Sequence, residues 1–128
     1  MRVTPVDAIA LSGLTAAALK LNASALNLVN AGDEAAVGAP GYKPVKVQNT
    51  TAPGGGVTAV ATTVKPASYL VFDPSSPVAS VQGLVAKPEI DPIAEVSNQL
   101  QAGQAFAFSV KVLQAQDETE KTLLDLKT

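Results

Sequence analysis

The sequence of 128 residues contains no cysteine, no histidine and no tryptophan. Without cysteine the chain has neither a disulfide framework nor a thiolate metal site. Without histidine it lacks the usual general base and the imidazole ligand, which excludes most hydrolase triads and most zinc sites. Aromatic residues make up only 4% of the chain. We therefore expect no enzymatic function and assign no cofactor and no metal.

Charge is sparse and mixed in sign. Nine basic residues stand against eleven acidic ones, which gives a net charge of −2, and the basic residues form no run. A nucleic-acid surface needs concentrated positive charge, so no nucleic-acid partner is expected. No set of polar residues has the pattern of a reaction site, so no small-molecule substrate is expected either.

The N-terminal apolar stretch is too short for a membrane span. Residues 8–19 give 12 uncharged positions, whereas a span needs about 20. The same stretch, preceded by Arg2, partly fits a signal peptide. Pro5 and Asp7 interrupt that pattern, and the apolar periodicity continues past Lys20. A cleaved signal peptide is therefore not expected.

Alanine is the most informative residue that the chain does have. The hydrophobic residues amount to 47% of the chain, and they include 22 alanines beside 36 residues of Val, Leu, Ile, Phe and Met. A large apolar side chain contributes roughly 1.5–3 kcal/mol when it is buried, and alanine much less. The composition therefore predicts a thin monomer core and close packing of helices, including packing against other chains.

Glycine and proline divide the chain into three segments. Eight of the nine prolines lie between residues 40 and 92, and seven of the nine glycines lie between residues 32 and 83. The two ends are nearly free of helix breakers. We expect an α+β fold in which long N- and C-terminal helices pair as a coiled-coil-like unit around a small β-rich middle segment. The predicted boundaries are 1–31, 32–90 and 91–128.

The N-terminal segment carries a helix start and an apolar stripe. Thr4 fits an N-cap, Pro5 the first helical position, and Asp7 the third position after the cap. Residues 30–32 form a helix stop. Apolar residues at alternating spacings of three and four form a heptad stripe of Leu11, Leu14, Ala18, Leu21, Ala25 and Leu28. We predict that this stripe is an assembly interface.

The C-terminal segment predicts a second and longer helix. It opens with Asp91 as a cap before Pro92 and should run to about Leu126. At 1.5 Å per residue the helix is roughly 50 Å long, so it needs a partner along its length. Its apolar stripe consists of Ile93, Val96, Leu100, Gly103, Phe106, Val110 and Leu113. All of these except the glycine are predicted assembly-interface residues.

The middle segment contains short runs rich in β-branched and aromatic residues. Residues 57–64, 69–72 and 84–86 are predicted strands. A flexible turn at residues 53–56 precedes the first of them, and a turn cluster at residues 73–77 follows the second. Because this β-element lies between two paired helices, the inner ends of those helices must lie near each other.

Three patterns that could carry chemistry have simpler structural explanations. The glycines at 54–56 precede a β-like run and lack the Lys-Ser/Thr pair of a phosphate loop, so an ordinary mobile loop is expected. The acidic residues at 117–120 fit a solvated helix face better than a cation site. Asp73 and Asp91 each precede a proline, which explains them as turn and cap residues rather than a catalytic pair.

Two phenylalanines indicate how the C-terminal helix is covered. Phe106 lies on the apolar stripe, where packing in a core or an interface is the expected role. Phe108 lies off that stripe. A large apolar residue on a second face indicates that the helix is buried on two sides, as in an assembly of several chains.

Several motifs occur in a characteristic order along the chain. The N-terminal ones are Ala10-Leu11-Ser12-Gly13-Leu14, Leu21-Asn22, Asn27-Leu28-Val29-Asn30-Ala31 and Pro40-Gly41-Tyr42-Lys43. The later ones are residues 69–79, 83–85 and 87–91, then Ala105-Phe106, Asp117-Glu118 and residues 122–126. In this order and spacing the motifs resemble the bacterial flagellar rod and hook proteins over almost the whole chain. The middle segment and the short length are similar to the proximal rod members of that family.

The resemblance implies that the two terminal helices form an inner tube from which the β-rich segment projects outward. It implies a structural subunit of the periplasm-spanning flagellar basal-body rod, which polymerises into a helical tube and transmits torque. The implied partners are copies of itself, other flagellar rod proteins and the flagellar export apparatus. Export through that apparatus needs no cleaved signal peptide.

The sequence departs from the family pattern at a few positions. Residues 32–34 stand where a Thr-containing loop is usual, Gln104 replaces an arginine, Phe108-Ser109 replace Ala-Asn, and Ser76 stands where a histidine is common. These changes leave an alternative function open. The alternative is a divergent secreted paralogue that acts as a binding or adhesion module, with the glycine loop and the Thr-rich strand recognising a ligand.

Overall fold

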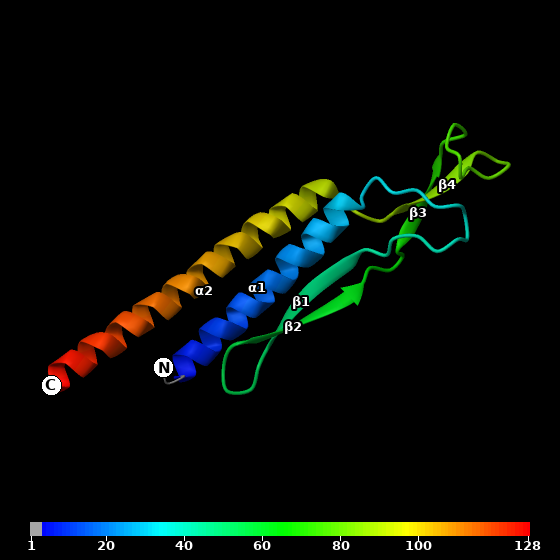
Figure 1. The fold of residues 1–128 in the computed structure, drawn as a ribbon. Helices are drawn as coiled ribbons and strands as arrows, with labels where there is room; N and C mark the ends of the chain where they lie inside the picture. The colour runs from blue at the N-terminus through cyan, green and yellow to red at the C-terminus, as the bar shows by residue number, and fades with distance from the viewer. Residues whose placement is uncertain (1–3) are drawn as a thin grey trace.

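Two long helices and two β-hairpins make up the computed structural model, which describes residues 4–128 (Figure 1). The elements in chain order are α1 (Pro5–Val29), β1 (Val45–Thr51), β2 (Val57–Thr63), β3 (Ser68–Phe72), β4 (Leu84–Pro88) and α2 (Pro92–Lys127). The predicted α+β class, with paired terminal helices and a small β-rich middle, is confirmed. The first three positions of the predicted segment 1–31, including Arg2 of the signal-peptide pattern, lie outside the described residues.

Both helices start at the predicted caps. The Thr4 hydroxyl accepts a hydrogen bond from the Asp7 backbone N–H, and the Asp7 carboxylate accepts one from the Thr4 N–H, which completes a capping box. The Asp91 carboxylate accepts bonds from the backbone N–H groups of Ile93 and Ala94. These bonds satisfy N–H groups that the first turn of a helix leaves without a partner.

The helices run antiparallel, and small residues line the contact between them. Near the C-terminal end of α1, the Ser24 hydroxyl donates to the backbone carbonyl of Glu95 at 2.7 Å. Eleven residues earlier along α1 the backbone comes so close to α2 that a Cβ on Gly13 would lie 2.9 Å from Ser109 Oγ. Because α2 is eleven residues longer than α1, its C-terminal end extends roughly 16 Å further, past the N-terminal end of α1 (Figure 1).

The β1–β2 hairpin lies along another side of α1 (Figure 1). Side chains of α1 hold two of its corners: Asn27 bonds both backbone groups of Val45, and the Ser12 hydroxyl accepts from the N–H of Val57. β2 agrees with the predicted strand at residues 57–64. β1 was not predicted, because its sequence VKVQNTT is largely polar and its strand conformation depends on pairing with β2.

The glycine turn between β1 and β2 also packs on α1. Gly55 and Gly56 have φ angles of +100° and +84°, which L side chains rarely adopt. A Cβ on Gly55 would lie 2.9 Å from Ile9 Cδ1, and one on Gly56 would lie 2.5 Å from Ser12 Oγ. The expectation of an ordinary mobile loop missed this contact with the helix.

The β3–β4 hairpin lies beyond the C-terminal end of α1 (Figure 1). Both strands agree with the predictions at residues 69–72 and 84–86. Val85 on β4 is completely buried, and Ala35 in the long loop after α1 forms a bridge with Ala86. The predicted turn after β3 is stabilised by Asp73, whose carboxylate accepts bonds from the N–H and the hydroxyl of Ser75.

The hydrophobic core is thin, as the alanine content predicted. Its buried apolar residues are Ala10, Ala16, Ala17, Ala23, Val85 and Ala102. Five of the six are alanines, and four of those lie on α1, between α2 and the hairpin. The core therefore depends on the close approach of backbones rather than on large side chains.

A bulky residue at the closest helix contact should separate the helices. We expect Gly13→Val to lower the free energy of unfolding by about 1–3 kcal/mol, since Ser109 leaves no room for a larger side chain. Gly103→Val is the matched control, because among residues 4–128 no atom outside the neighbouring backbone of α2 lies within 4 Å of a Cβ at that position. Urea unfolding followed by helical circular dichroism measures both variants, and equal stability of the two would contradict the close contact.

Candidate assembly surfaces of the two helices

The buried side chain of Asn27 joins four segments of the chain. Only 1% of this residue is exposed. Its amide nitrogen donates to the Val45 carbonyl at 2.7 Å and to the Glu95 carboxylate at 3.1 Å. Its amide oxygen accepts from the Tyr42 hydroxyl at 2.7 Å and from the Val45 N–H at 3.0 Å. The one side chain therefore fixes the loop after α1, the start of β1 and the first turn of α2 against α1.

Electrostatics at this point involve Tyr42 and Glu95. Burial, together with the negative charge of Glu95, raises the pKa of Tyr42 above its ordinary value of 10.0. The phenol is therefore a neutral donor to Asn27 at ordinary pH. This polar cluster was not predicted from the sequence. The available signal was an asparagine among the leucines of α1, and Asn27 and Tyr42 both lie in the motifs that carry the family resemblance.

The structure divides the predicted stripe on α1 between two environments. Leu14, Leu21 and Leu28 are half-buried, whereas Leu11, Ala18 and Ala25 are exposed. The buried residues of α1 instead include Ala10, Ala17, Ser24 and Asn27, each one position before a member of the predicted stripe. Two stripes that differ by one residue have the same spacing of three and four, so periodicity alone does not tell which one faces α2.

The predicted stripe on α2 is also largely uncovered. Ile93, Val96, Leu100 and Phe106 are exposed, and Val110 and Leu113 are half-buried. The side chain of α2 that is buried is Ala102. The pairing of the two helices thus buries small residues and leaves most of the large apolar side chains of the predicted stripes exposed or half-buried.

An apolar groove of about 370 Å³ opens where α1, α2 and the tip of the β1–β2 hairpin meet. Val6 and Ile9 of α1, Val57 of β2, and Phe108 and Val112 of α2 line it. Phe108 is 69% exposed at the rim, in keeping with the expectation that a second face of this helix is apolar. Further along α2, beyond a charged stretch, Leu123, Leu124 and Leu126 are exposed as well.

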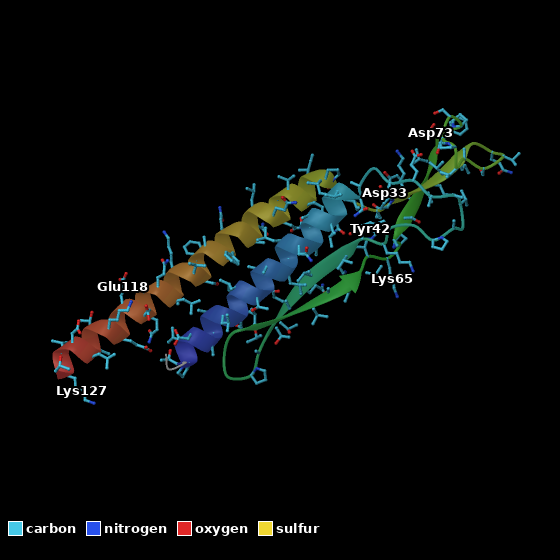
Figure 2. The ribbon with its side chains drawn as sticks, in the orientation of Figure 1. Asp33, Tyr42, Lys65, Asp73, Glu118 and Lys127 are labelled. Atoms are coloured by element: carbon cyan, nitrogen blue, oxygen red, sulfur yellow. The ribbon has the colours of Figure 1, made fainter. Side chains whose placement is uncertain are left out.

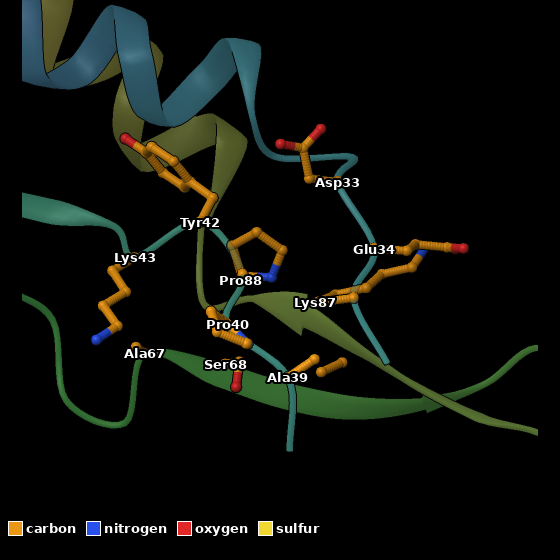
Figure 3. A pocket seen from close by; sticks show the side chains of 13 residues that line it. Asp33, Glu34, Ala39, Pro40, Tyr42, Lys43, Ala67, Ser68, Lys87 and Pro88 are labelled. Carbon is orange, nitrogen blue, oxygen red and sulfur yellow. The ribbon is translucent and has the colours of Figure 1, made fainter. Parts of the chain in front are cut away.

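A larger cavity of about 410 Å³ lies between the loop after α1 and the β3–β4 hairpin (Figure 3). Its charged residues include Asp33, Glu34, Lys43 and Lys87, and the Lys87 ammonium pairs with the Glu34 carboxylate at 3.3 Å. Glu34 also accepts a bond from the Ser76 hydroxyl at 2.7 Å. Two of the positions that depart from the family pattern, 34 and 76, are therefore in direct contact.

Two other acidic residues, Asp117 and Asp73, have local partners. Asp117 pairs with Lys121 one turn along α2 at 2.9 Å, on an exposed surface where such a pair contributes little. The hydrogen bond from the Ser75 hydroxyl lowers the pKa of Asp73 below its usual range. Within residues 4–128 there is no group of three or more Asp or Glu side chains placed to hold a metal ion.

By length and composition, α1 is apolar enough to cross a membrane, which the 12-residue uncharged stretch did not predict. The core helix of a water-soluble protein has the same properties. In this fold, α1 packs against α2 and against the hairpin through its alanines.

Comparisons with known proteins place relatives along most of the chain. A profile of the family described as flagellar basal body rod FlgEFG protein C-terminal matches residues 81–126, which span β4 and most of α2. The flagellar basal-body rod protein FlgC of Escherichia coli O157:H7 is 36% identical over 112 residues, which cover 82% of this chain and 83% of that protein.

Two further relatives carry the same name. FlgC of Yersinia enterocolitica is 36% identical over 126 residues, covering 94% of this chain and 90% of the relative. FlgC of Salmonella typhimurium is 33% identical over 111 residues, covering 82% of this chain and 83% of the relative. The similarity therefore includes both helices and the β-rich middle.

Removal of the buried amide should loosen all four segments that it joins. Asn27→Ala leaves the Val45 N–H and the Tyr42 hydroxyl without their acceptor, so we expect the free energy of unfolding to fall by about 2–3 kcal/mol. Asn22→Ala, at an exposed position of the same helix, should change it by less than about 0.5 kcal/mol. Urea unfolding compares the two, and a small effect at Asn27 would contradict its central role.

The raised pKa of Tyr42 predicts a loss of stability in alkali. Since the neutral phenol is favoured in the folded chain, its contribution is complete below about pH 10 and is lost as pH rises through the raised pKa. Tyr42→Phe should be less stable at pH 8 by about 1 kcal/mol, because it lacks the bond to Asn27. The difference between variant and parent should shrink between pH 10 and 12, as measured by unfolding at each pH; a constant difference would refute this.

Proposed function

Because the chain belongs to the family of flagellar basal-body rod proteins that includes FlgC, we propose that it is a structural subunit of the proximal part of the flagellar rod. In this role it polymerises with copies of itself and with other rod proteins into a helical tube that transmits torque. It reaches the basal body through the flagellar export apparatus, without a cleaved signal peptide. The role needs no active site and no cofactor.

The observation that carries this proposal is the uncovered apolar surface of the helix pair. The two helices pack against each other through small residues, namely alanine, glycine and serine. Large apolar residues remain outside on both of them, among them Leu11, Leu26, Ile93, Leu100 and Leu123. A monomer of this size rarely leaves so much apolar side chain in contact with water, and such surfaces mark protein–protein contacts.

The predicted stripes supply the interface of the proposed tube. Its members on α1 are Leu11, Leu14, Ala18, Leu21, Ala25 and Leu28. Its members on α2 are Ile93, Val96, Leu100, Phe106, Val110 and Leu113. In the proposed tube the stripe on α1 of one copy packs against the stripe on α2 of the next copy. Such a head-to-tail contact is heterologous, and heterologous contacts that do not close into a ring generate a helical array.

The alternative of a secreted binding module is less well supported. Such a module would need the segment 32–90 to fold by itself. The β1–β2 hairpin instead depends on α1, because Asn27 and Ser12 hold its corners and the glycine turn packs on Ile9. The relatives whose similarity covers both helices are named as rod proteins.

A charge in the outer stripe should prevent assembly without unfolding the subunit. Leu11 is 52% exposed, so Leu11→Asp should leave the helical circular dichroism of the purified chain unchanged. In a growing rod the carboxylate would lose its water against an apolar neighbour, which is costly. We expect at least tenfold fewer assembled rods in electron micrographs of basal bodies. Leu21→Asp and Leu28→Asp should also abolish assembly.

The comparison strains are a deletion and a conservative variant. Deletion of the gene should abolish flagella, and Leu11→Met, which keeps an apolar side chain, should restore them. A motile deletion strain would refute the proposed function. Normal rods in the Leu11→Asp strain would leave the function in place and exclude this stripe as the interface.

A further inference from the structure

The two edges of the β3–β4 sheet differ in how their backbone groups are satisfied. In an antiparallel pair, the backbone groups of successive residues point alternately towards the partner strand and away from it. The bonds from Asp73 N–H to Gly83 O and from Glu89 N–H to Ala67 O show which residues of β3 and β4 point towards each other. Along β4, the backbone N–H groups that point away from β3 all have hydrogen-bond partners. Ala86 exchanges two bonds with Ala35, Leu84 bonds Ser80 through both its N–H and its carbonyl, and Pro88 has no N–H.

The outer edge of β3 has no such partners. By the same alternation, the backbone N–H and carbonyl groups of Ser68, Leu70 and Phe72 point away from β4. Within residues 4–128, no group bonds to the backbone of these three residues apart from the sheet itself. The edge therefore offers three donors and three acceptors to an incoming strand.

The side chains of β3 are typical of a strand that is covered by a partner. The sequence Ser-Tyr-Leu-Val-Phe has no charge and no proline, the usual features that protect an exposed edge. Leu70 is 55% exposed and Phe72 is 70% exposed on one face of the sheet, and Tyr69 is 45% exposed on the other. An edge that is open and apolar on both faces is a template for strand addition.

We propose that β3 of one copy pairs edge to edge with β2 of a second copy, so that strand addition links successive subunits. This inference rests on the proposed function, since it names the contact between the copies of the rod. The occupant is β2 because its residues Val57–Thr63 carry no charge and form the other suitable open edge. The adjacent β1 contains Lys46 and Gln48 and borders a cavity beside Glu95 and Asn98 of α2.

The hydrogen-bonding pattern of β2 fits this role. The bonds from Ala52 N–H to Gly56 O and from Val64 N–H to Pro44 O show which residues of β1 and β2 point towards each other. The groups of Ala59, Ala61 and Thr63 then point outward, and no bond to them occurs in the described part of the chain apart from the hairpin ladder. The edge is held at its start, where Ser12 binds the Val57 N–H.

Because the two strands lie at different places along the molecule, this contact can repeat from one copy to the next. β3 lies near the end of the molecule marked by Asp73, and β2 lies beside α1 towards the opposite end, which Glu118 and Lys127 mark (Figure 2). Pairing of β3 with the β2 of a neighbour therefore shifts the second copy along the long axis. Pairing of β3 with β3 would be isologous and would close into a dimer, which ends growth.

A proline on the free edge tests the proposal. Because the Leu70 N–H points away from β4, Leu70→Pro removes one donor from the open edge without removing a bond of the hairpin. Leu70→Val, which keeps the N–H, is the matched control. We expect Leu70→Pro to reduce the yield of assembled rods at least tenfold and Leu70→Val to leave it within twofold. Equal yields from the two variants would overturn the proposal.

Cross-linking decides the matter even where the proline variant folds poorly. The chain has no cysteine, so disulfides between introduced cysteines report unambiguous contacts. We expect Leu70→Cys copies to form mixed dimers with copies carrying Ala59→Cys, Ala61→Cys or Thr63→Cys during assembly, and not with Gln48→Cys copies. Dimers of Leu70→Cys alone, cross-links to a different protein, or no cross-link would overturn the pairing.

The failure of this inference is distinguishable from failure of the proposed function. A deletion strain that still assembles rods refutes the function itself. A deletion strain without rods, together with normal rods in the Leu70→Pro strain, refutes only the pairing of β3 with β2.

Discussion

The relative placement of α1, α2 and the β1–β2 hairpin depends on the buried amide of Asn27. All of its hydrogen-bonding atoms have partners, and these partners come from the loop after α1, from β1 and from α2. Inside a protein, a polar group that is fully bonded fixes one arrangement, because any shift leaves it unpaired at a cost of about 1–3 kcal/mol. A thin alanine core is tolerant of sliding, so this amide supplies the register that the apolar contacts do not define.

Small residues at the helix contact explain where the large ones are. Close approach at Gly13 and Ala102 brings the backbones of α1 and α2 together, and the leucines on either side cannot enter that space. Several of them, such as Leu11, Leu26 and Leu100, remain exposed on the outer surface, where they can stabilise a contact with another chain. The thin core of the subunit and the large surface available for assembly therefore have a single cause.

Local sequence features predicted the elements well and their contacts only in part. Caps at Thr4 and Asp91, the two helices and three of the four strands follow from residues that are neighbours in sequence. β1 escaped prediction because its conformation comes from its partner strand. The face of α1 that meets α2 escaped because two stripes share one period, and the role of Asn27 escaped because its partners lie between 15 and 68 residues away.

The pairing of the first and last helices has a consequence for folding kinetics. The bond between Ser24 and Glu95 joins residues 71 apart, and closing a loop of that length costs about 4 kcal/mol of chain entropy before the contact contributes anything. Contacts so distant in sequence make nucleation slow. In a nascent chain the β1–β2 hairpin can cover one side of α1 early, but the side of α1 that meets α2 has no partner until α2 has been synthesised.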